Sequence, residues 1–395
     1  MGSRFHRAVL AALLVAVCLP AARAADSGAA DSGAADGVDK SGRWLAVEFP
    51  RDSPVVVVSF NMGPSTAHVR GMSMALDLHA SVVLRNIGSK PISGVTLRVE
   101  AQDLTPSGKG SVTMPSLYIP PGEVFPVRID MELLRPFNVP KTDAAIVQVA
   151  LDCALFNDLT AYGPDKLHSR RSLMVFELQA RRDRRYLAKL LEGGRTAQVR
   201  EELGFGMQDV NPQQLGLELL QGPRAQSRPE QPLTVDPVSF ASSPVQAMRG
   251  AAQVSGNEVR IPRVEVRNIS QKAVRSIEMG WIVRDERGRD FVAGSLPASM
   301  ALGPVQTVSL NQSGTLRFLR PTGQPMTIGA LMTFVSDVEF VDGKLWIPSR
   351  DDIYQATSDP ILRRELATSP EQQRLTDIYR RKGMTGLIEE LKRQD

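Results

Sequence analysis

Two similar stretches in the two halves of the chain decide the fold. Arg85–Val95 reads RNIGSKPISGV, and Arg267–Ile277 reads RNISQKAVRSI. They share Arg, Asn, Ile and Lys at matching positions and carry aliphatic residues at two more. Similarity of this kind at long range within one chain indicates a duplicated unit.

Shorter matches follow in the same order along the chain, which makes coincidence a poor explanation. They pair Ser59-Phe60 with Ser239-Phe240, Val69–Gly71 with Met248–Gly250, Asp158 with Asp337, Lys166-Leu167 with Lys344-Leu345, Gly194 with Gly383, and Glu201–Leu203 with Glu389–Leu391. The separation drifts slightly along the series, as small insertions would produce. The sequence therefore predicts two copies of one unit, over 43–203 and 233–395.

Within each unit, short runs alternate between apolar and polar residues. Ile277, Met279, Trp281 and Val283 would share one face of a strand, and Asp342-Gly343 is typical of a hairpin turn. Many short strands separated by turn residues predict a mostly β fold, with an antiparallel sandwich in each unit.

A helical periodicity follows each sandwich. Leu187, Leu190 and Leu191 form one apolar stripe, and Leu375, Ile378 and Tyr379 form the matching one. Gly194 and Gly383 would end the first helix of each pair. We expect an αα-hairpin after each sandwich, packed on it through the stripe, and a Pro- and Gly-containing linker over 204–232.

The stretch 264–288, VEVRNISQKAVRSIEMGWIVRDERG, resembles the strand–turn–strand signature of bacterial extracytoplasmic Ig-like or fibronectin-III-like domains, including those of the FxLYD type. The resemblance implies two tandem Ig-like β-sandwiches outside the cytoplasm, of a kind that mostly mediates binding or acts as a spacer. Trp281 stands where an Ig domain has its core tryptophan, and its counterpart in the first unit is Val99.

The first residues have the pattern of an export signal. A basic start is followed by the apolar run Ala8–Leu19 and by Ala22-Arg23-Ala24, so we expect a signal peptide over 1–24 and a flexible spacer over 25–42. A permanent membrane anchor and a lipoprotein modified at Cys18 are the alternatives. Cleavage would leave 44 basic and 43 acidic residues, a balance that does not predict nucleic-acid binding.

The residues that could carry chemistry are few. Gly71–Ala75 approximates a nucleophile elbow but lies in a strand-like context, and His68, His79 and His168 lack the spacing of metal ligands. Cys153 falls in an apolar alternating run and is expected to be buried and inert, with intermolecular pairing as the alternative. The sequence predicts no catalytic residue, cofactor or metal.

The densest charge cluster is the candidate partner-binding site, formed by Arg181, Arg182, Arg184 and Arg185. We expect these side chains to face outward and to attract an acidic protein or, peripherally, an anionic membrane surface. A solvated helix face with intrahelical ion pairs is the simpler interpretation.

These features favour a non-enzymatic, exported protein, periplasmic or secreted, that acts as a binding or scaffolding module. The alternative is a carbohydrate-binding or glycan-active accessory protein, because sandwiches often carry sugar sites. A hydrolase built from scattered carboxylates is a third hypothesis, since paired acids need only be close in space.

Overall fold

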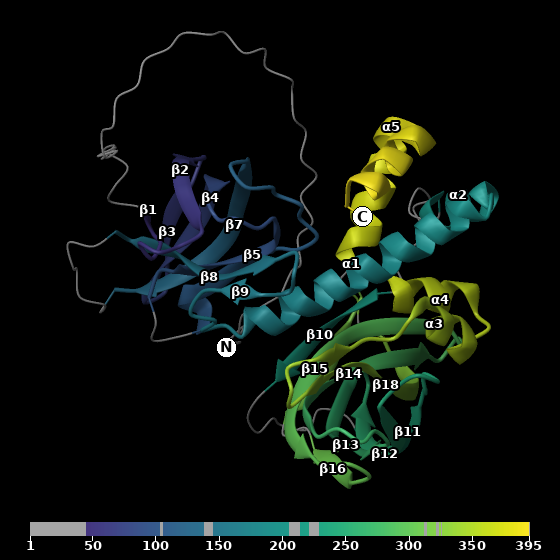
Figure 1. Cartoon of the computed structure of the whole chain (residues 1–395). Helices are drawn as coiled ribbons and strands as arrows, with labels where there is room; N and C mark the ends of the chain where they lie inside the picture. Colours follow the sequence, from purple (N-terminus) through teal and green to yellow (C-terminus); the bar gives the residue numbers. More distant parts are fainter. Residues whose placement is uncertain are drawn as a thin grey trace, which may run out of the picture. The chain divides into compact units, whose positions relative to one another are not determined.

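The computed structural model describes residues 45–102, 106–137, 145–204, 214–220, 229–311, 314–320, 324 and 326–394 (Figure 1). The expected signal peptide and spacer lie outside these residues. The described chain divides into two compact units, 45–173 and 174–394, and the division falls within helix α1 (Ser169–Glu192). This division differs from the expected one, because most of the first helical hairpin belongs to the second unit.

The first unit has two sheets that enclose one core. One sheet joins β2 (Val55–Met62), β3 (Thr66–Arg70) and β7 (Val124–Pro136) to the long β4 (Ser73–Asn86). The other has the order β1 (Leu45–Glu48), β8 (Val147–Phe156), β5 (Ile92–Glu100) and β6 (Lys109–Met114), with the short β9 (Ala161–Tyr162) also on β8. A single turn of 3-10 helix, Pro106–Gly108, precedes β6. The alternating apolar residues of both sheets, among them Val82, Val99 and Val149, are fully buried between them.

The strand pairings of the second unit close into a ring. Its order is β11 (Gln231–Pro237), β12 (Val245–Ser255), β13 (Glu258–Asn268), β17 (Thr315–Leu319), β10 (Gln214–Leu220), β15 (Asp290–Leu302), β14 (Val274–Asp285) and β18 (Ile328–Phe340), which pairs again with β11. The strands β16 (Thr307–Asn311) and β19 (Leu345–Trp346) pair with β13 and β18. The chain is mostly β, as predicted, but this ring is not two separate sheets.

The ring is closed by two features, the pairing of β11 with β12 and strand β10, and β10 corrects the expected linker. Residues 214–220 bond antiparallel to β17 and parallel to β15, so they bridge two strands that would otherwise be edges. Leu215 is buried in the core of the unit, and Leu217 packs against it. The alternation of leucine with Gly216 and Glu218 is what a strand with one buried face requires.

Apart from β10 and the β11–β12 pairing, which has no counterpart between β1 and β2, the strand pairings of the two units correspond, as a duplication predicts. In each, the first strand pairs in parallel with the penultimate one (β1 with β8, β11 with β18), and that strand also carries the last, two-residue strand. The hairpin turns match as well, since Gly71 and Gly256 both have φ near +60° between the strands they connect.

A buried asparagine from the RN-I motif ends β4 in the first unit and β13 in the second. The Asn86 amide donates to the carbonyls of Lys90 and Ile119, and the Asn268 amide donates to those of Lys272, Leu302 and Gly303. Both asparagines are fully buried, so these bonds satisfy backbone carbonyls that would otherwise have no hydrogen-bond partner.

The structure corrects several of the sequence matches. Asp158 forms an ion pair with Lys90, and Asp342 forms the equivalent pair with Lys272. Asp158 therefore corresponds to Asp342 and not to Asp337. Ser53 and Ser243 each donate to the carbonyl two residues on, at Val55 and Val245. This equivalence excludes the pairing of Ser59-Phe60 with Ser239-Phe240, which precede β12. Met248–Gly250 lies inside β12, whereas Val69–Gly71 ends in a turn.

The remaining helices are α2 (Thr196–Gly204), α3 (Arg350–Ala356), α4 (Pro360–Ala367) and α5 (Pro370–Gln394), which kinks at Gly383. Gly194 and Gly383 adopt positive φ angles of 68° and 65° at the two helical bends, a conformation that glycine adopts without steric cost. None of the described helices is long and apolar enough to cross a membrane.

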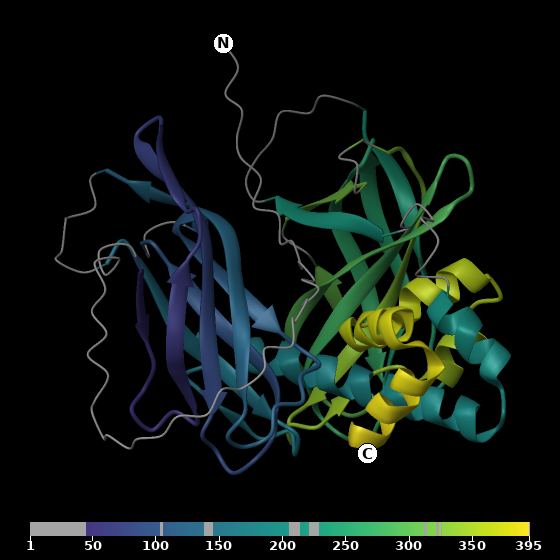
Figure 2. The same cartoon turned by 90° about the horizontal axis from the view of Figure 1, so that it is seen from above.

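The two helical hairpins pack against each other, and this corrects the expectation that each covers its own sandwich. One cluster buries the stripes of both, with Leu187, Leu190, Val199 and Leu203 from α1 and α2 against Leu375, Leu387 and Leu391 from α5 (Figure 2). The sheet of the second unit is covered instead by α3 and α4, through Ile353, Leu362 and Ala367. Short helices need such burial to persist in water.

Candidate functional site

The arginine cluster that the sequence singled out lies on α1, and half of it is buried. Arg182 and Arg184 are each only 8% exposed. Arg181 pairs with Glu177 one turn earlier at 2.8 Å, and the Arg185 Nε donates to the Arg181 carbonyl. The prediction that all four side chains face outward is therefore wrong for Arg182 and Arg184.

Asp183 is the centre of a buried ionic cluster between the two helical hairpins. Its Oδ1 lies 2.9 Å from the Nε of Arg182 and 2.9 Å from the Nε of Arg350, and its Oδ2 accepts a bond from the Ser369 hydroxyl. Arg182 also donates to the carbonyl of Ala367 at 2.8 Å. These bonds connect α1 to the start of α3 and to the chain between α4 and α5.

The electrostatics of this cluster favour a charged Asp183. Burial alone would raise the pKa of its carboxyl group, but the charges of Arg182 and Arg350 outweigh burial and lower that pKa. Burial lowers the pKa of Arg182, and the Asp183 charge opposes this shift. A buried pair of this kind stabilises only while both partners are present.

A second ionic cluster continues the contact. Arg184 contacts Glu177 and Glu371 at 3.2 Å each, and Glu371 is also paired with Arg374 at 2.8 Å. Arg374 reaches Glu390 near the end of α5 at 2.6 Å. The arginines at the centre of these clusters thus hold the hairpins together rather than offering a surface to a partner.

The hydroxyl groups of Tyr186 and Tyr354 share the carboxylate of Glu202, a contact that the sequence did not predict. The Tyr186 hydroxyl donates to Glu202 Oε1 at 3.0 Å, and the Tyr354 hydroxyl donates to the same oxygen. The guanidinium of Arg350 lies 5.1 Å from the centre of the Tyr186 ring. Burial is the main cause of the raised pKa of both tyrosines, which keeps them protonated donors.

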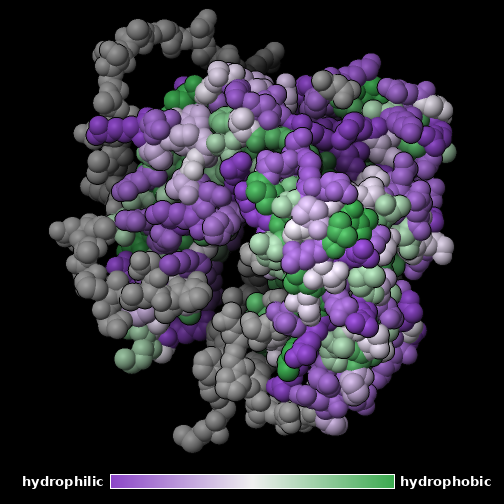
Figure 3. All heavy atoms as spheres, turned by 60° about the horizontal axis from the view of Figure 1, so that its bottom comes forward, coloured by the Kyte–Doolittle hydropathy of each residue, from purple (hydrophilic) through white to green (hydrophobic). Residues whose placement is uncertain are grey.

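An exposed apolar tip is the first candidate surface that the structure adds. At the β3–β4 hairpin, Val69 is 73% exposed and Met72 is 87% exposed, and Phe137, just after β7, is 56% exposed. The Phe137 amide donates to the Met72 carbonyl at 3.3 Å, so the three side chains belong to one small region. We call Val69, Met72 and Phe137 the apolar tip. On the face shown in Figure 3, by contrast, hydrophilic residues dominate and hydrophobic ones lie in small separate groups.

Three other residues considered from the sequence, Ser73, His79 and Cys153, lie in strands of the first unit. Ser73 begins β4 and pairs across the hairpin with Arg70. His79 is held by Asp130 at 2.8 Å and Asp77 at 3.3 Å on an exposed sheet face, and the bond to Asp130 is the main cause of its raised pKa. Cys153 is 1% exposed, and burial raises its thiol pKa to about 12. Within the described residues, no group of acidic, histidine or cysteine side chains could hold a metal ion.

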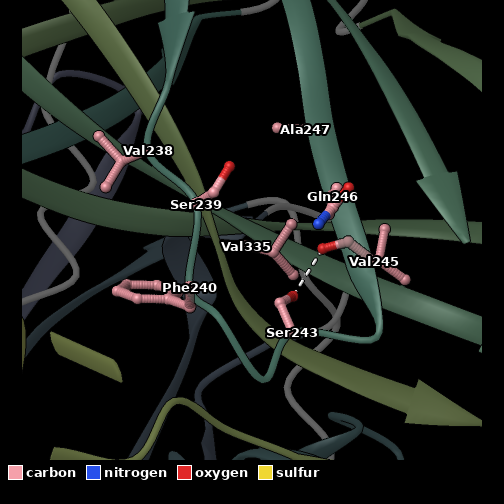
Figure 4. Close-up of a pocket in the computed structure, with 8 residues that line it drawn as sticks. All are labelled: Val238, Ser239, Phe240, Ser243, Val245, Gln246, Ala247 and Val335. Carbon is pink, nitrogen blue, oxygen red and sulfur yellow. Dashed lines mark hydrogen bonds between the residues drawn. The ribbon is translucent and has the colours of Figure 1, made fainter. Parts of the chain in front are cut away.

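Two hollows lie in the second unit. The first, with a volume of about 0 Å³, has no room for a water molecule, and it is bordered by the chain before β12, where the Ser243 hydroxyl donates to the Val245 carbonyl (Figure 4). It is therefore not a ligand site, since such sites measure about 300–1,000 Å³.

The second hollow has a volume of about 20 Å³, room for about one water molecule. It is lined by apolar residues of β13, β14, β15 and β16, among them Val264, Met279, Trp281, Leu296 and Leu310.

Comparison with known proteins adds no identification. No protein-family model matches the sequence, and neither does any curated protein. A hypothetical protein from Peptoclostridium difficile 630 is 13% identical, with a TM-score of 0.18 over 29% of this chain and 90% of that one.

Two enzymes of known structure give similarly weak matches. Red sea bream transglutaminase is 10% identical, with a TM-score of 0.13 over 73% of this chain and 29% of the enzyme. A β-glucosidase from Kluyveromyces marxianus is 10% identical, with a TM-score of 0.15 over 68% of this chain and 45% of the enzyme. Likenesses at this level say nothing about activity.

Proposed function

We propose that this chain is a non-enzymatic binding or scaffolding protein that acts outside the cytoplasm and contacts a protein partner through the apolar tip. The observation that carries the proposal is the exposure of Val69, Met72 and Phe137 together. Large apolar side chains that gather on a surface, rather than standing singly, mark interaction sites. Methionine suits such a site because its flexible thioether adapts to the partner.

The rest of the first unit supports this role by holding the tip in place. Val69 pairs with Met74 across the hairpin, and Ser73 pairs with Pro136 on the other side of β4. The adjacent Arg70 and Glu132 form an ion pair at 2.7 Å, which supplies a polar rim beside the apolar residues. An apolar centre with a polar rim is the usual anatomy of a protein interface.

We further infer that both β units descend from one Ig-like or fibronectin-III-like sandwich. In the first unit, β2, β3, β4 and β7 face β6, β5, β8 and β1, an arrangement of two antiparallel sheets with one parallel strand at an edge. Export fits the signal-like sequence over 1–24. Mass spectrometry of the protein from its native host tests export, with a chain that begins at Ala25 as the expected result.

Photo-crosslinking tests the partner site. A benzoylphenylalanine placed at Met72 should give a discrete protein adduct in the native host, identifiable by mass spectrometry. The same probe at Ile87, which is 55% exposed at the opposite end of β4, is the matched control and should not give it. Val69→Ser with Phe137→Ser should remove the adduct. Adducts to lipid or glycan alone, or equal adducts from both positions, would contradict the proposal.

The carbohydrate alternative has less support from the aromatic residues. Trp281 is buried, and Trp346 is partly buried, packs near Phe240 and donates its Nε1 to the Ser242 hydroxyl at 3.2 Å. Of the predicted partner-binding arginines, Arg181 and Arg185 retain exposure on α1, so a weak contact with an acidic partner or anionic membrane stays a secondary proposal.

A further inference from the structure

A turn at one end of the second unit holds a valine in a conformation that suits glycine. Val305 has a φ of 60°, and its counterpart in the first unit is Gly122, with a φ of 85°. The equivalence follows from matching bonds, because the backbone N–H of the buried asparagine donates in each unit to the carbonyl of the residue after this position, Glu123 or Gln306. A β-branched residue with a positive φ is strained, whereas glycine adopts this conformation without steric cost.

Burial within the chain does not offset this strain. The Val305 residue is 57% exposed, so most of its apolar surface contacts water. Strained backbone of this kind occurs preferentially where it serves a function. An exposed apolar side chain that is held at such a cost indicates a contact with something outside the chain.

Two further aliphatic residues are exposed on the neighbouring turns. Ile269 is 44% exposed and Val341 is 55% exposed. The backbone N–H of the residue before Ile269 donates to the carbonyl of the residue after Val305, and the Val341 N–H donates to the Ala273 carbonyl, each at 3.0 Å. These bonds join the three turns at one end of the strand ring. We call Ile269, Val305 and Val341 the aliphatic turns.

The first unit does not carry the same set. Asn157 stands there in place of Val341, because its N–H donates to the Pro91 carbonyl as the Val341 N–H does in the corresponding turn. Glycine and asparagine in the first unit thus correspond to two exposed valines in the second. Core packing does not explain this difference, since all of these positions except the glycine place a side chain at the surface.

Basic residues accompany the aliphatic turns. The chain from 267 to 275 and from 339 to 344 includes four basic side chains and two acidic ones. Each acid is paired with one of the bases, at 2.8 Å and 3.2 Å. The other two bases, Arg267 and Lys344, are exposed and leave an excess of positive charge at this end of the unit.

We propose that the aliphatic turns contact the surface of an anionic lipid membrane, with their side chains in the interfacial region and Arg267 and Lys344 beside the lipid headgroups. Each basic residue near an anionic bilayer strengthens binding about fivefold. A bilayer surrounds exposed side chains without a matching shape, whereas a stable protein interface needs about 800 Å² from each partner, far more than three aliphatic side chains supply. This contact is separate from the apolar tip.

Co-sedimentation with vesicles tests the proposal. The chain from Ala25 onward is used, because the apolar run Ala8–Leu19 would itself bind lipid, and it retains every described residue. We expect saturable binding to vesicles of phosphatidylglycerol and phosphatidylcholine in equal parts. Binding to phosphatidylcholine alone should be about tenfold weaker, and raised salt should weaken binding to the anionic vesicles.

The first unit supplies the residues for a matched variant. Val305→Gly with Val341→Asn should weaken binding to the anionic vesicles about tenfold, because two apolar side chains are lost from the interface. The midpoint of thermal unfolding should not fall, since glycine fits the positive φ. Val69→Ser with Phe137→Ser, in the apolar tip, should leave vesicle binding unchanged, which separates this proposal from the protein partner.

A fluorescent label locates the contact. Nitrobenzoxadiazole on Val305→Cys should emit at shorter wavelength when anionic vesicles are added. The same label on Ile261→Cys, which is also 57% exposed but lies near the other end of β13, should not change, and the buried Cys153 stays unlabelled. No binding of the unaltered chain to anionic vesicles, equal binding to phosphatidylcholine alone, unchanged binding of the valine double variant, or a shift from both labels would overturn the proposal.

Discussion

Asp183 is the carboxylate on which Arg182 and Arg350 both depend. Asp183→Asn would leave two buried guanidinium groups next to each other with their shared counter-charge removed. Breaking a buried pair in this way costs about 3–5 kcal/mol of the free energy of unfolding. Denaturant unfolding measures the loss, and Asp377→Asn, which removes a half-exposed partner of Arg380, should change stability by less than about 1 kcal/mol.

The same residue makes stability dependent on pH. The pKa of Asp183 in the folded protein lies below its usual value of 3.8. The stabilisation is therefore fully present above pH 3.8 and is lost as pH falls through the lower folded value, because the unfolded chain then takes up the proton first. Acid titration of the unfolding free energy should show this loss, and Asp183→Asn should make the curve shallower. An unchanged slope would mean that Asp183 is not charged in the fold.

Cys153 should react slowly with thiol reagents. Its side chain is 1% exposed, and a pKa near 12 leaves almost no thiolate at neutral pH. Labelling of the native protein should be slight until denaturant is added. Rapid labelling, or a dimer that a reductant separates, would contradict the burial.

Among the elements, the turns after β4 and β13 should both matter for stability. Asn86→Ala leaves two backbone carbonyls without their donor, and Asn268→Ala leaves three, so each change should cost at least about 1–3 kcal/mol. Asn61→Ala, at an exposed position of β2, is the control and should be nearly neutral. Thermal unfolding checks all three, and a neutral Asn86→Ala would show that these bonds contribute nothing net.

The strands and the duplication could be predicted from sequence because alternation and the RN-I motif are local signals. Strand β10 was missed although Leu215 and Leu217 alternate with polar or small residues, since the surrounding prolines indicated a linker. The burial of Arg182 and Arg184 could not be predicted. Their partners Arg350, Ser369 and Glu371 are far away in sequence, and a basic run by itself reads as a solvated face.

For the molecule as a whole, the hairpins of both repeats should act as one folding element. A fragment spanning 174–395 keeps both, whereas 214–395 keeps β10 and the ring but loses α1 and α2, exposing Leu375, Leu387 and Leu391. We expect the longer fragment to be monomeric and the shorter one to self-associate or to lose helix content, as light scattering and circular dichroism would show. Two monomeric, fully helical fragments would mean that α5 does not need the first hairpin.

The shared stripe also bears on how such a chain could have arisen. Leu187, Val199 and Leu203 on one hairpin correspond to Leu375, Leu387 and Leu391 on the other, so equivalent surfaces meet, as they do across the two-fold axis of an isologous dimer. A single-unit ancestor with this stripe would have exposed it to water unless two copies associated. Gene duplication then converts a homodimer into one polypeptide, and the two halves become free to diverge, as Val99 and Trp281 have. A present-day relative with only one unit is expected to be a homodimer.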